Sequence, residues 1–266
     1  MLQENTPYHH LFEAARYTLL SGGKRLRPVL TLLIAEMLGG NIETALAPAC
    51  AVEMIHSYSL IHDDLPCMDD DDVRRGKPTL HMVYNEGHAV LTGDFLLTLA
   101  FQVIAEDEKL SAEQRVDMIQ VLTAASAAHG LIGGQVVDLM DGPKDIEDLR
   151  QLHQNKTGAL FRAAAELGAI AAQANDEERK LIRLFGETLG LAYQILNDIL
   201  DVSSSQELRG TAISSDVKNG KVTYVTLLGP ERAMEEFERL MESCREILKQ
   251  FSGKAEMLEL YLQSIR

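Results

Sequence analysis

The chain has few cysteines, and none is placed for a disulfide framework or a metal site. Only three occur among 266 residues, Cys50, Cys67 and Cys244, and they are odd in number, far apart and without metal-type spacing. We therefore expect reduced thiols in a cytoplasmic protein. The first residues lack a basic region followed by an apolar run, so no secretory signal is expected.

Cations are also scarce. Lysine and arginine number 25 against 40 aspartates and glutamates, which gives a formal net charge of −15. Nucleic acid needs a basic footprint and is excluded as a partner, and anionic membrane surfaces are disfavoured for the same reason. No uninterrupted apolar run is long enough to span a bilayer. An anionic small molecule would need a metal ion or a local basic patch.

The sequence has no run of period-two strands, no βαβ rhythm, no low-complexity segment and no linker. Its length permits one large domain or two small ones. The dominant periodicity is helical, and segment 28–38 is apolar nearly all round, as in a helix buried inside a bundle. Helices are predicted over 28–38, 43–62, 88–105, 112–129, 148–173 and 176–202, with two more within 231–265.

Six aspartates crowd into residues 63–72 around Pro66. Two like charges about 4 Å apart repel by roughly 4 kcal/mol at a surface-like dielectric, and a divalent cation removes that cost. Oxygen ligands select magnesium, manganese or calcium, but the spacing does not match the calcium-binding helix–loop–helix pattern. The plainer alternative is a solvated acidic loop. The cations that follow, Arg74, Arg75 and Lys77, favour instead a multidentate anionic substrate.

Two further basic pieces precede this stretch. The segment Gly22–Pro28 combines a diglycine with three cations, which suits a phosphate cradle, although an ordinary solvated turn is the simpler interpretation. The spacing of a nucleotide-binding phosphate loop is absent. His56 lies two helical turns before Asp63 on the same face, where a lone histidine is more often structural.

A second acidic cluster lies in a helical segment. Gln194, Asn197 and Asp201 are three and four residues apart, so they share one helix face. We expect this face to complete a metal site from the opposite side of a bundle.

Together these segments resemble the trans-isoprenyl diphosphate synthases, and most closely the bacterial farnesyl and geranylgeranyl diphosphate synthases. The segments that carry the resemblance are Gly22-Gly-Lys-Arg-Leu-Arg-Pro28, residues 59–79, Gly133-Gly-Gln-Val-Val-Asp138, Lys156-Thr-Gly-Ala-Leu160 and Asn197-Asp-Ile-Leu-Asp201. The resemblance implies one all-α domain over 1–266, a large helical bundle around a central cavity of the isoprenoid synthase type. It also implies a homodimer that condenses isopentenyl diphosphate with an allylic diphosphate.

The resemblance also assigns roles to individual residues. Two to three magnesium ions, with manganese as a possible substitute, are expected on the oxygen ligands Asp63, Asp69, Asn197 and Asp201, with Asp64 in support. The expected contacts of the allylic diphosphate are Arg74 and Lys156, with Lys221 as a further basic contact. The expected isopentenyl diphosphate set is Lys24, Arg27, His56 and Arg75. Thr157 and Gln194 are expected to line the reacting centre.

Product length is expected to depend on residues one turn before the acidic motif. Tyr58 and Ser59 stand five and four positions before Asp63. A tyrosine there, with the two extra residues Pro66 and Cys67, resembles the farnesyl type, whereas geranylgeranyl enzymes often carry a smaller residue. We therefore predict a fifteen-carbon product, with Tyr58 as the floor of the cavity.

Two positions depart from the family pattern. Asn197 stands where an aspartate is usual, and Gly210-Thr211 stands where Gly-Lys is usual. Three explanations compete: a working enzyme in which Asp198, Asp201 and Lys221 compensate, a slow enzyme, or a non-catalytic prenyl-diphosphate-binding subunit. The first is favoured because the motif at 63–69 is complete. A terpene cyclase would not need the isopentenyl diphosphate set.

Overall fold

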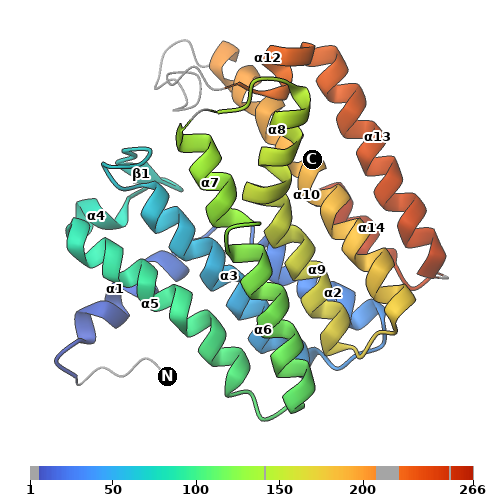
Figure 1. Cartoon of the computed structure of the whole chain (residues 1–266), viewed down its shortest axis with the longest axis horizontal. Coiled ribbons are helices and arrows are strands. Elements are labelled where there is room, and N and C mark those ends of the chain that lie inside the picture. Colours follow the sequence, from blue (N-terminus) through green and yellow to red (C-terminus); the bar gives the residue numbers. More distant parts are fainter. Residues whose placement is uncertain (1–5, 141, 208–221, 252, 266) are drawn as a thin grey trace.

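A computed structural model describes residues 6–140, 142–207, 222–251 and 253–265, with only the backbone described over 202–207. The described part is helical apart from one short hairpin (Figure 1). The N-terminal helices are α1 (His9–Leu19), α2 (Leu26–Met37), α3 (Ile42–Asp63), α4 (Leu80–Val83), α5 (Glu86–Ala105), α6 (Ala112–Ser126) and α7 (Leu131–Met140). They are followed by α8 (Ile146–His153), the π-helical turn η1 (Gln154–Gly158), α9 (Ala159–Ala171), α10 (Asp176–Glu207), α12 (Tyr224–Leu228), α13 (Pro230–Leu248), the 3₁₀ turn η2 (Lys249–Phe251) and α14 (Glu256–Ser264).

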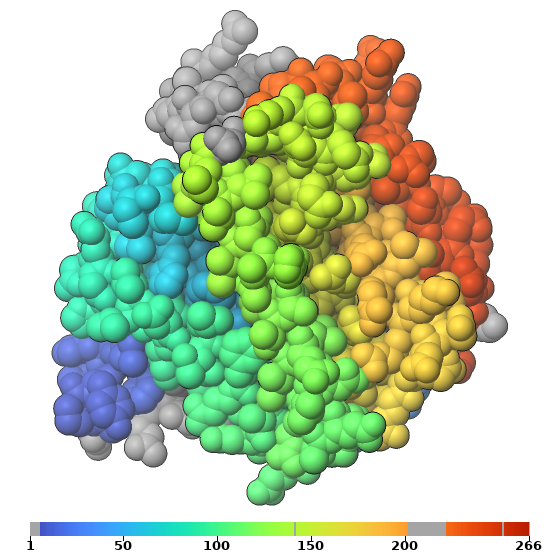
Figure 2. All heavy atoms as spheres, viewed as in Figure 1, coloured from blue at the N-terminus to red at the C-terminus, as the bar shows by residue number. Residues whose placement is uncertain are grey.

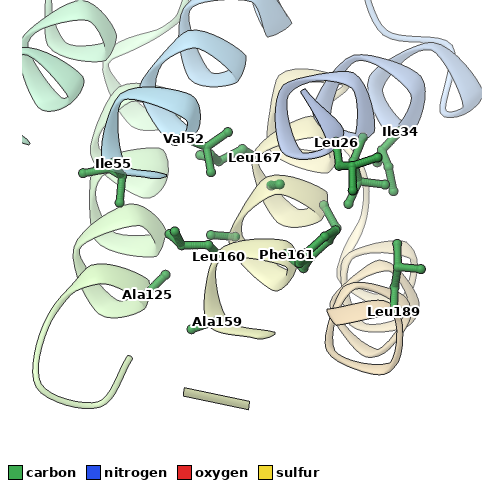
Figure 3. Close-up of a cluster of buried hydrophobic side chains, with 14 of the residues drawn as sticks. Leu26, Ile34, Val52, Ile55, Ala125, Ala159, Leu160, Phe161, Leu167 and Leu189 are labelled. Carbon is green, nitrogen blue, oxygen red and sulfur yellow. The ribbon is translucent and has the colours of Figure 1, made fainter. Parts of the chain in front are cut away.

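Helix α9 forms the centre of the bundle. Almost all of its residues are buried, and it packs against α2, α3, α6 and α10 (Figure 3). Its alanines and Gly168 allow close approach: a Cβ on Gly168 would lie 2.4 Å from the carbonyl oxygen of Thr31 in α2. The Thr31 hydroxyl in turn donates to the Ala164 carbonyl oxygen over 2.8 Å. The all-α bundle predicted from periodicity is thus confirmed.

Most of the predicted helices are present, with differences at glycine and π-helical positions. The segment predicted as one helix over 148–173 is interrupted by the π turn η1, and the helix predicted over 112–129 ends at Ser126 before a turn at 127–130. Gly133 and Gly134 lie inside α7, a helix that the ranges predicted from the sequence do not include. Helices α1, α4, α7 and α12 were not predicted.

A two-residue hairpin follows the acidic stretch. Strands β1 (Val73–Arg74) and β2 (Lys77–Pro78) pair antiparallel through the turn at Arg75 and Gly76. Both turn residues have positive φ, 54° and 73°, as the right-handed twist of a two-residue hairpin requires. Strands this short show no period-two pattern, which is why the sequence did not reveal them.

Two stretches are long and apolar enough in composition to cross a membrane: α5, and residues 112–140 comprising α6 and α7. This measure tolerates charged residues, and α5 contains Glu86 and Asp94, so it is not the uninterrupted apolar run that the sequence analysis considered. The turn at 127–130 interrupts the second stretch, and α5 packs against α1, α3, α4 and α6. Length and composition alone are weak evidence for a membrane span, because core helices pass the same test.

Candidate functional site

The loop after α3 folds back onto the end of that helix. The Asp69 backbone N–H donates to the Asp63 carbonyl oxygen over 2.9 Å, and the Asp71 N–H donates to that of Asp64 over 3.3 Å. Asp70 adopts φ 54°, which reverses the chain. The structure therefore brings the Asp63 and Asp69 segments side by side, as the paired ligands of a metal ion require.

Burial sets the electrostatics of this acidic end. It raises the pKa of Asp63 to about 6, and the charges of Asp69 and Asp64 push in the same direction, while Lys156 and Arg74 oppose them. Burial also raises the pKa of Asp64, which Arg74 opposes through a hydrogen bond from Nε at 2.6 Å and an ion pair through Nη2 at 2.5 Å. The Asp64 carboxylate is thus paired with Arg74, which fits its expected role in support of the metal ligands.

The donor set fits a hard divalent cation that shares its coordination with substrate. Burial makes the ionised form of the Asp63 carboxylate costlier than in water, and a cation bound beside it would offset that cost. Among the described residues, the tight group of three potential metal-ligating side chains is His9, His10 and Glu13 at the start of α1, not the acidic motif. The acidic motif therefore does not form a closed protein cage, which suits magnesium held by one or two carboxylates plus phosphate oxygens.

A cluster of guanidinium groups surrounds His56. Burial lowers the pKa of His56 well below its ordinary value, and the charges of Arg27, Arg75, Arg74 and Arg25 lower it further, so the imidazole is neutral near pH 7. Arg27 is buried, with its guanidinium carbon 4.6 Å from the centre of the Phe161 ring, and its Nε has no hydrogen-bond partner. A buried, unpaired guanidinium donor beside further cations is suited to an oxyanion.

The diglycine loop before α2 is held by Arg75. Its guanidinium donates to the Gly22 carbonyl oxygen over 2.7 Å, and a Cβ on Gly23 would lie 2.5 Å from the guanidinium carbon. Arg25, which has φ 52°, donates to the Glu53 carboxylate of α3 and to the Leu19 carbonyl oxygen. Lys24 is exposed, and within the described chain no hydrogen bond or ion pair engages it. The loop is thus fixed on both sides while Lys24 points to solvent.

Lys156 lies in the π turn and pairs with Asp138 of α7. Its Nζ is 2.6 Å from the Asp138 carboxylate, and its charge acts on Asp63. The two helices meet at Gly134, where a Cβ would lie 2.5 Å from the Lys156 backbone nitrogen. A π-helical bulge often marks a functional position. Here it places Lys156 between α7 and the acidic end of α3.

A chain of hydrogen bonds links the π turn to α10. The Thr157 hydroxyl donates to the Gln194 side-chain oxygen over 2.9 Å, and the Gln194 amide donates to Asp198 over 3.3 Å. The other Asp198 oxygen accepts from the Tyr224 backbone N–H over 2.9 Å. Asp198 is buried and joins α10 to the start of α12, whereas Asn197 is half-buried and its side chain makes no hydrogen bond among the described residues.

Tyr58 lies one turn before the acidic motif and is buried. Its hydroxyl has no hydrogen-bond partner, and burial raises its pKa to about 12, with a smaller contribution from Asp63. Ser59 is also buried, and its hydroxyl donates to the His56 carbonyl oxygen over 3.0 Å within α3.

Several predicted residues are brought together, and some partners were missed. Asp63 and Asp69 meet at the loop, Arg27 and Arg75 lie near His56, and Thr157 contacts Gln194. Lys221, Gly210 and Thr211 lie outside the described residues. The sequence did not predict the Asp138 partner of Lys156 or the Glu53 partner of Arg25. Asp138 is the last residue of the family segment Gly133-Gly-Gln-Val-Val-Asp138, and this place in the motif could have pointed to it.

Comparisons with known proteins agree with this arrangement. The chain matches the polyprenyl synthetase family profile over residues 8–262. It is 46% identical over 248 residues to the putative geranylgeranyl pyrophosphate synthase 8, chloroplastic, of Arabidopsis thaliana, covering 91% of this chain and 69% of that protein. It is 43% identical over 249 residues to a geranylgeranyl diphosphate synthase of Cyanophora paradoxa, covering 92% and 83%. An FPP/GFPP synthase structure from Zymomonas mobilis aligns with TM-score 0.86 and 37% identity, covering 100% of this chain and 89% of that one.

Proposed function

We propose that this chain, which belongs to the polyprenyl synthetase family, condenses isopentenyl diphosphate with dimethylallyl or geranyl diphosphate to give farnesyl diphosphate as its main product. It is a transferase of the prenyl diphosphate synthase type. The observation that carries the proposal is that an acidic group and a basic group meet α3 at different points. The carboxylates at the end of α3 face Lys156. His56 lies two turns earlier on α3, and the guanidinium groups that act on its neutral ring come from other elements.

In this proposal, magnesium binds the acidic residues together with the allylic diphosphate. Its protein ligands are Asp63 and Asp69, with Asn197 and Asp201 for a third ion. Bound metal supplies positive charge for the leaving diphosphate. The chain's own contribution there is Lys156, whose ammonium leaves the Asp138 carboxylate for the substrate, and Arg74, which opposes the effect of burial on the pKa of Asp64. Manganese is expected to substitute for magnesium.

Isopentenyl diphosphate is held by the basic cluster. Arg27 offers its unpartnered Nε, His56 offers a neutral ring, and Lys24 and Arg75 close the site from the loop and the hairpin turn. The hydroxyl of Thr157, oriented by Gln194, lies near the reacting centre. Lys221 would be a further basic contact of the allylic diphosphate. The apolar interior of the bundle shields the allylic cation from water.

The test is a magnesium-dependent assay with dimethylallyl and geranyl diphosphate plus labelled isopentenyl diphosphate, with the products sized. We expect a fifteen-carbon product from the wild type and longer products from Tyr58→Ala. A twenty-carbon wild-type product would favour the second candidate, a geranylgeranyl diphosphate synthase, which the names of the relatives above support. An unchanged product length in Tyr58→Ala would reject Tyr58 as the floor.

Whether the enzyme is fully active or weaker depends on how well Asn197 binds a third metal ion. An asparagine keeps a carbonyl oxygen but lacks charge, so a third ion should bind more weakly. Asp198 supports compensation less than Asp201 does, because its carboxylate is buried and joined to Gln194 and Tyr224. We expect Asn197→Asp to lower the magnesium concentration needed for half-maximal activity. No turnover in either protein would favour a prenyl-diphosphate-binding subunit, and one relative is named as a heterodimeric large subunit.

The assembly proposed is a homodimer formed through α5 and α6. Both helices lie at the surface of the face seen in Figure 2, and both expose apolar side chains, Leu91 at 62% and Val116 at 56%. Exposed apolar patches on a bundle of this kind mark interaction surfaces.

We also propose that the protein is cytoplasmic. The basis of this proposal is the cysteines, which are free, with Cys50 and Cys67 exposed and Cys244 buried.

A further inference from the structure

Helix α5 has a gap in its surface where a side chain of α3 enters. Gly93 is buried, and a Cβ built on it would lie 2.1 Å from Nε2 and 2.6 Å from Cδ2 of His62. Cβ atoms essentially never approach so closely, so the imidazole occupies the volume that any larger residue at position 93 would fill. Gly93 is therefore a slot for the His62 ring between the two helices.

The ring is fixed in this slot from one side and contacts Tyr58 on another. Its Nε2 lies 3.1 Å from the Val90 carbonyl oxygen, which can only accept, so Nε2 carries the proton. The His62 and Tyr58 rings meet edge to face, with centroids 5.8 Å apart and planes at 76°. His62 is thus held by α5 and packs against the residue one turn before it on α3.

Tyr58 depends on this contact for its orientation. It is only 5% exposed, and its hydroxyl makes no hydrogen bond that would anchor the ring. Packing alone must then fix its rotamer, and an edge-to-face aromatic contact is a directional part of that packing. Ring motion at Tyr58 would change the depth of any cavity that it closes.

We propose that His62, seated in the Gly93 slot, is a positioning residue that holds the Tyr58 ring and thereby determines product length. The inference rests on the proposed function, in which Tyr58 closes the chain-length cavity. It also gives Gly93 an indirect part in specificity, although α5 carries none of the residues assigned to substrate.

The main experiment compares product length in the wild type, His62→Ala and His62→Phe. We expect His62→Ala to raise the ratio of twenty-carbon to fifteen-carbon product by about threefold to tenfold, the range that loss of one aromatic contact supports. His62→Phe keeps a ring of similar shape and should keep the wild-type ratio. The ratio is read among turned-over molecules, so a general loss of activity or stability does not move it.

Gly93 is tested in two backgrounds. Gly93→Ala should change the product ratio in the wild type but add nothing in His62→Ala, because the methyl group acts only by displacing the ring. Gly87→Ala is the matched control in the same helix, since its Cβ would meet nothing closer than 3.4 Å and Gly87 is exposed. If Gly93→Ala fails to fold, as judged by circular dichroism, the comparison of His62→Ala with His62→Phe still tests the proposal.

The outcomes separate the inference from the proposed function. If Tyr58→Ala lengthens the product while His62→Ala leaves the ratio at its wild-type value, the positioning role is overturned and the proposed function stands. If His62→Phe lengthens the product as much as His62→Ala does, the ring contact is not the cause and the inference is overturned as well. If the wild type makes no prenyl product, or Tyr58→Ala has no effect, the proposed function or its floor fails, and the inference fails with it.

Discussion

At the scale of single residues, several groups that look equivalent in the sequence differ in what they contact. Adjacent Asn197 and Asp198 illustrate this. The side chain of Asn197 is half-buried and makes no hydrogen bond within the described chain, so it is open to a ligand. Asp198 is 5% exposed and accepts from Gln194 and from the Tyr224 backbone. One helical step of about 100° therefore separates a candidate ligand from a residue that holds the bundle together.

This difference predicts distinct effects of substitution. Asp198→Ala leaves the buried Tyr224 backbone N–H and the part-buried Gln194 amide without their acceptor and should lower the free energy of unfolding by about 2 kcal/mol. The magnesium concentration for half-maximal activity should stay near the wild-type value. Asp201→Ala should instead raise the magnesium requirement. Urea unfolding and magnesium titrations of both variants check this, and a raised requirement with unchanged stability in Asp198→Ala would contradict it.

His153 predicts a pH dependence of stability. Burial lowers its pKa from 6.5 to about 4, and its ring stacks on Tyr224 with an unpartnered Nδ1. Because the folded state disfavours the proton, this stability is present above pH 6.5 and is lost as the pH falls towards 4. At about pH 5 the loss should be about 2 kcal/mol. His153→Phe keeps the stacking and should reduce the stability difference between pH 7.5 and pH 5 by this amount. An equal difference in both proteins would reject the assignment, with His88→Phe as the exposed control.

At the scale of elements, the contact between α7 and η1 brings a lysine to the acidic site. Gly134→Ala would place a methyl group 2.5 Å from the Lys156 backbone nitrogen, and backbone cannot yield as a side chain can. We expect a loss of about 1–3 kcal/mol of stability from overpacking and a fall of about tenfold to hundredfold in kcat/KM. Val137→Ala, at an exposed position of the same helix, is the control. Wild-type kinetics in Gly134→Ala would show that the contact is not needed to place Lys156.

The same elements show how far the sequence could predict the structure. Long helices with continuous apolar spacing, such as α3 and α5, were predicted to within two residues at each end. Helix α7 was missed because Gly133 and Gly134 resemble a turn, and the reason for Gly134 is a neighbour 22 residues away in the chain. The acidic motif was predicted because its aspartates crowd together in sequence. The basic set of Lys24, Arg27, His56 and Arg75 is spread over residues 24–75 and was expected only from the family resemblance. The Lys156–Asp138 and Arg25–Glu53 pairs join separate elements and needed the fold.

At the scale of the whole molecule, the proposed homodimer through the exposed apolar side chains of α5 and α6 predicts self-association. We expect light scattering with size-exclusion chromatography to give twice the chain mass of 29.4 kDa. Leu91→Glu should shift the protein towards a monomer, because a buried, unpaired charge at an interface is costly. Leu260→Glu, at a position 51% exposed on α14, is the control and should leave the mass unchanged. A monomeric wild type would contradict the dimer.

The contacts of Arg75 with the diglycine loop also limit which residues can replace Gly22 and Gly23. Gly22 and Gly23 both have positive φ, 90° and 105°, but a Cβ at Gly22 meets nothing within 4 Å, whereas one at Gly23 meets the Arg75 guanidinium. In a library randomised at both positions and selected for activity, Gly22 should therefore admit occasional replacements, such as asparagine, at the cost of backbone strain alone. Position 23 should return glycine, unless Arg75 changes in the same clone.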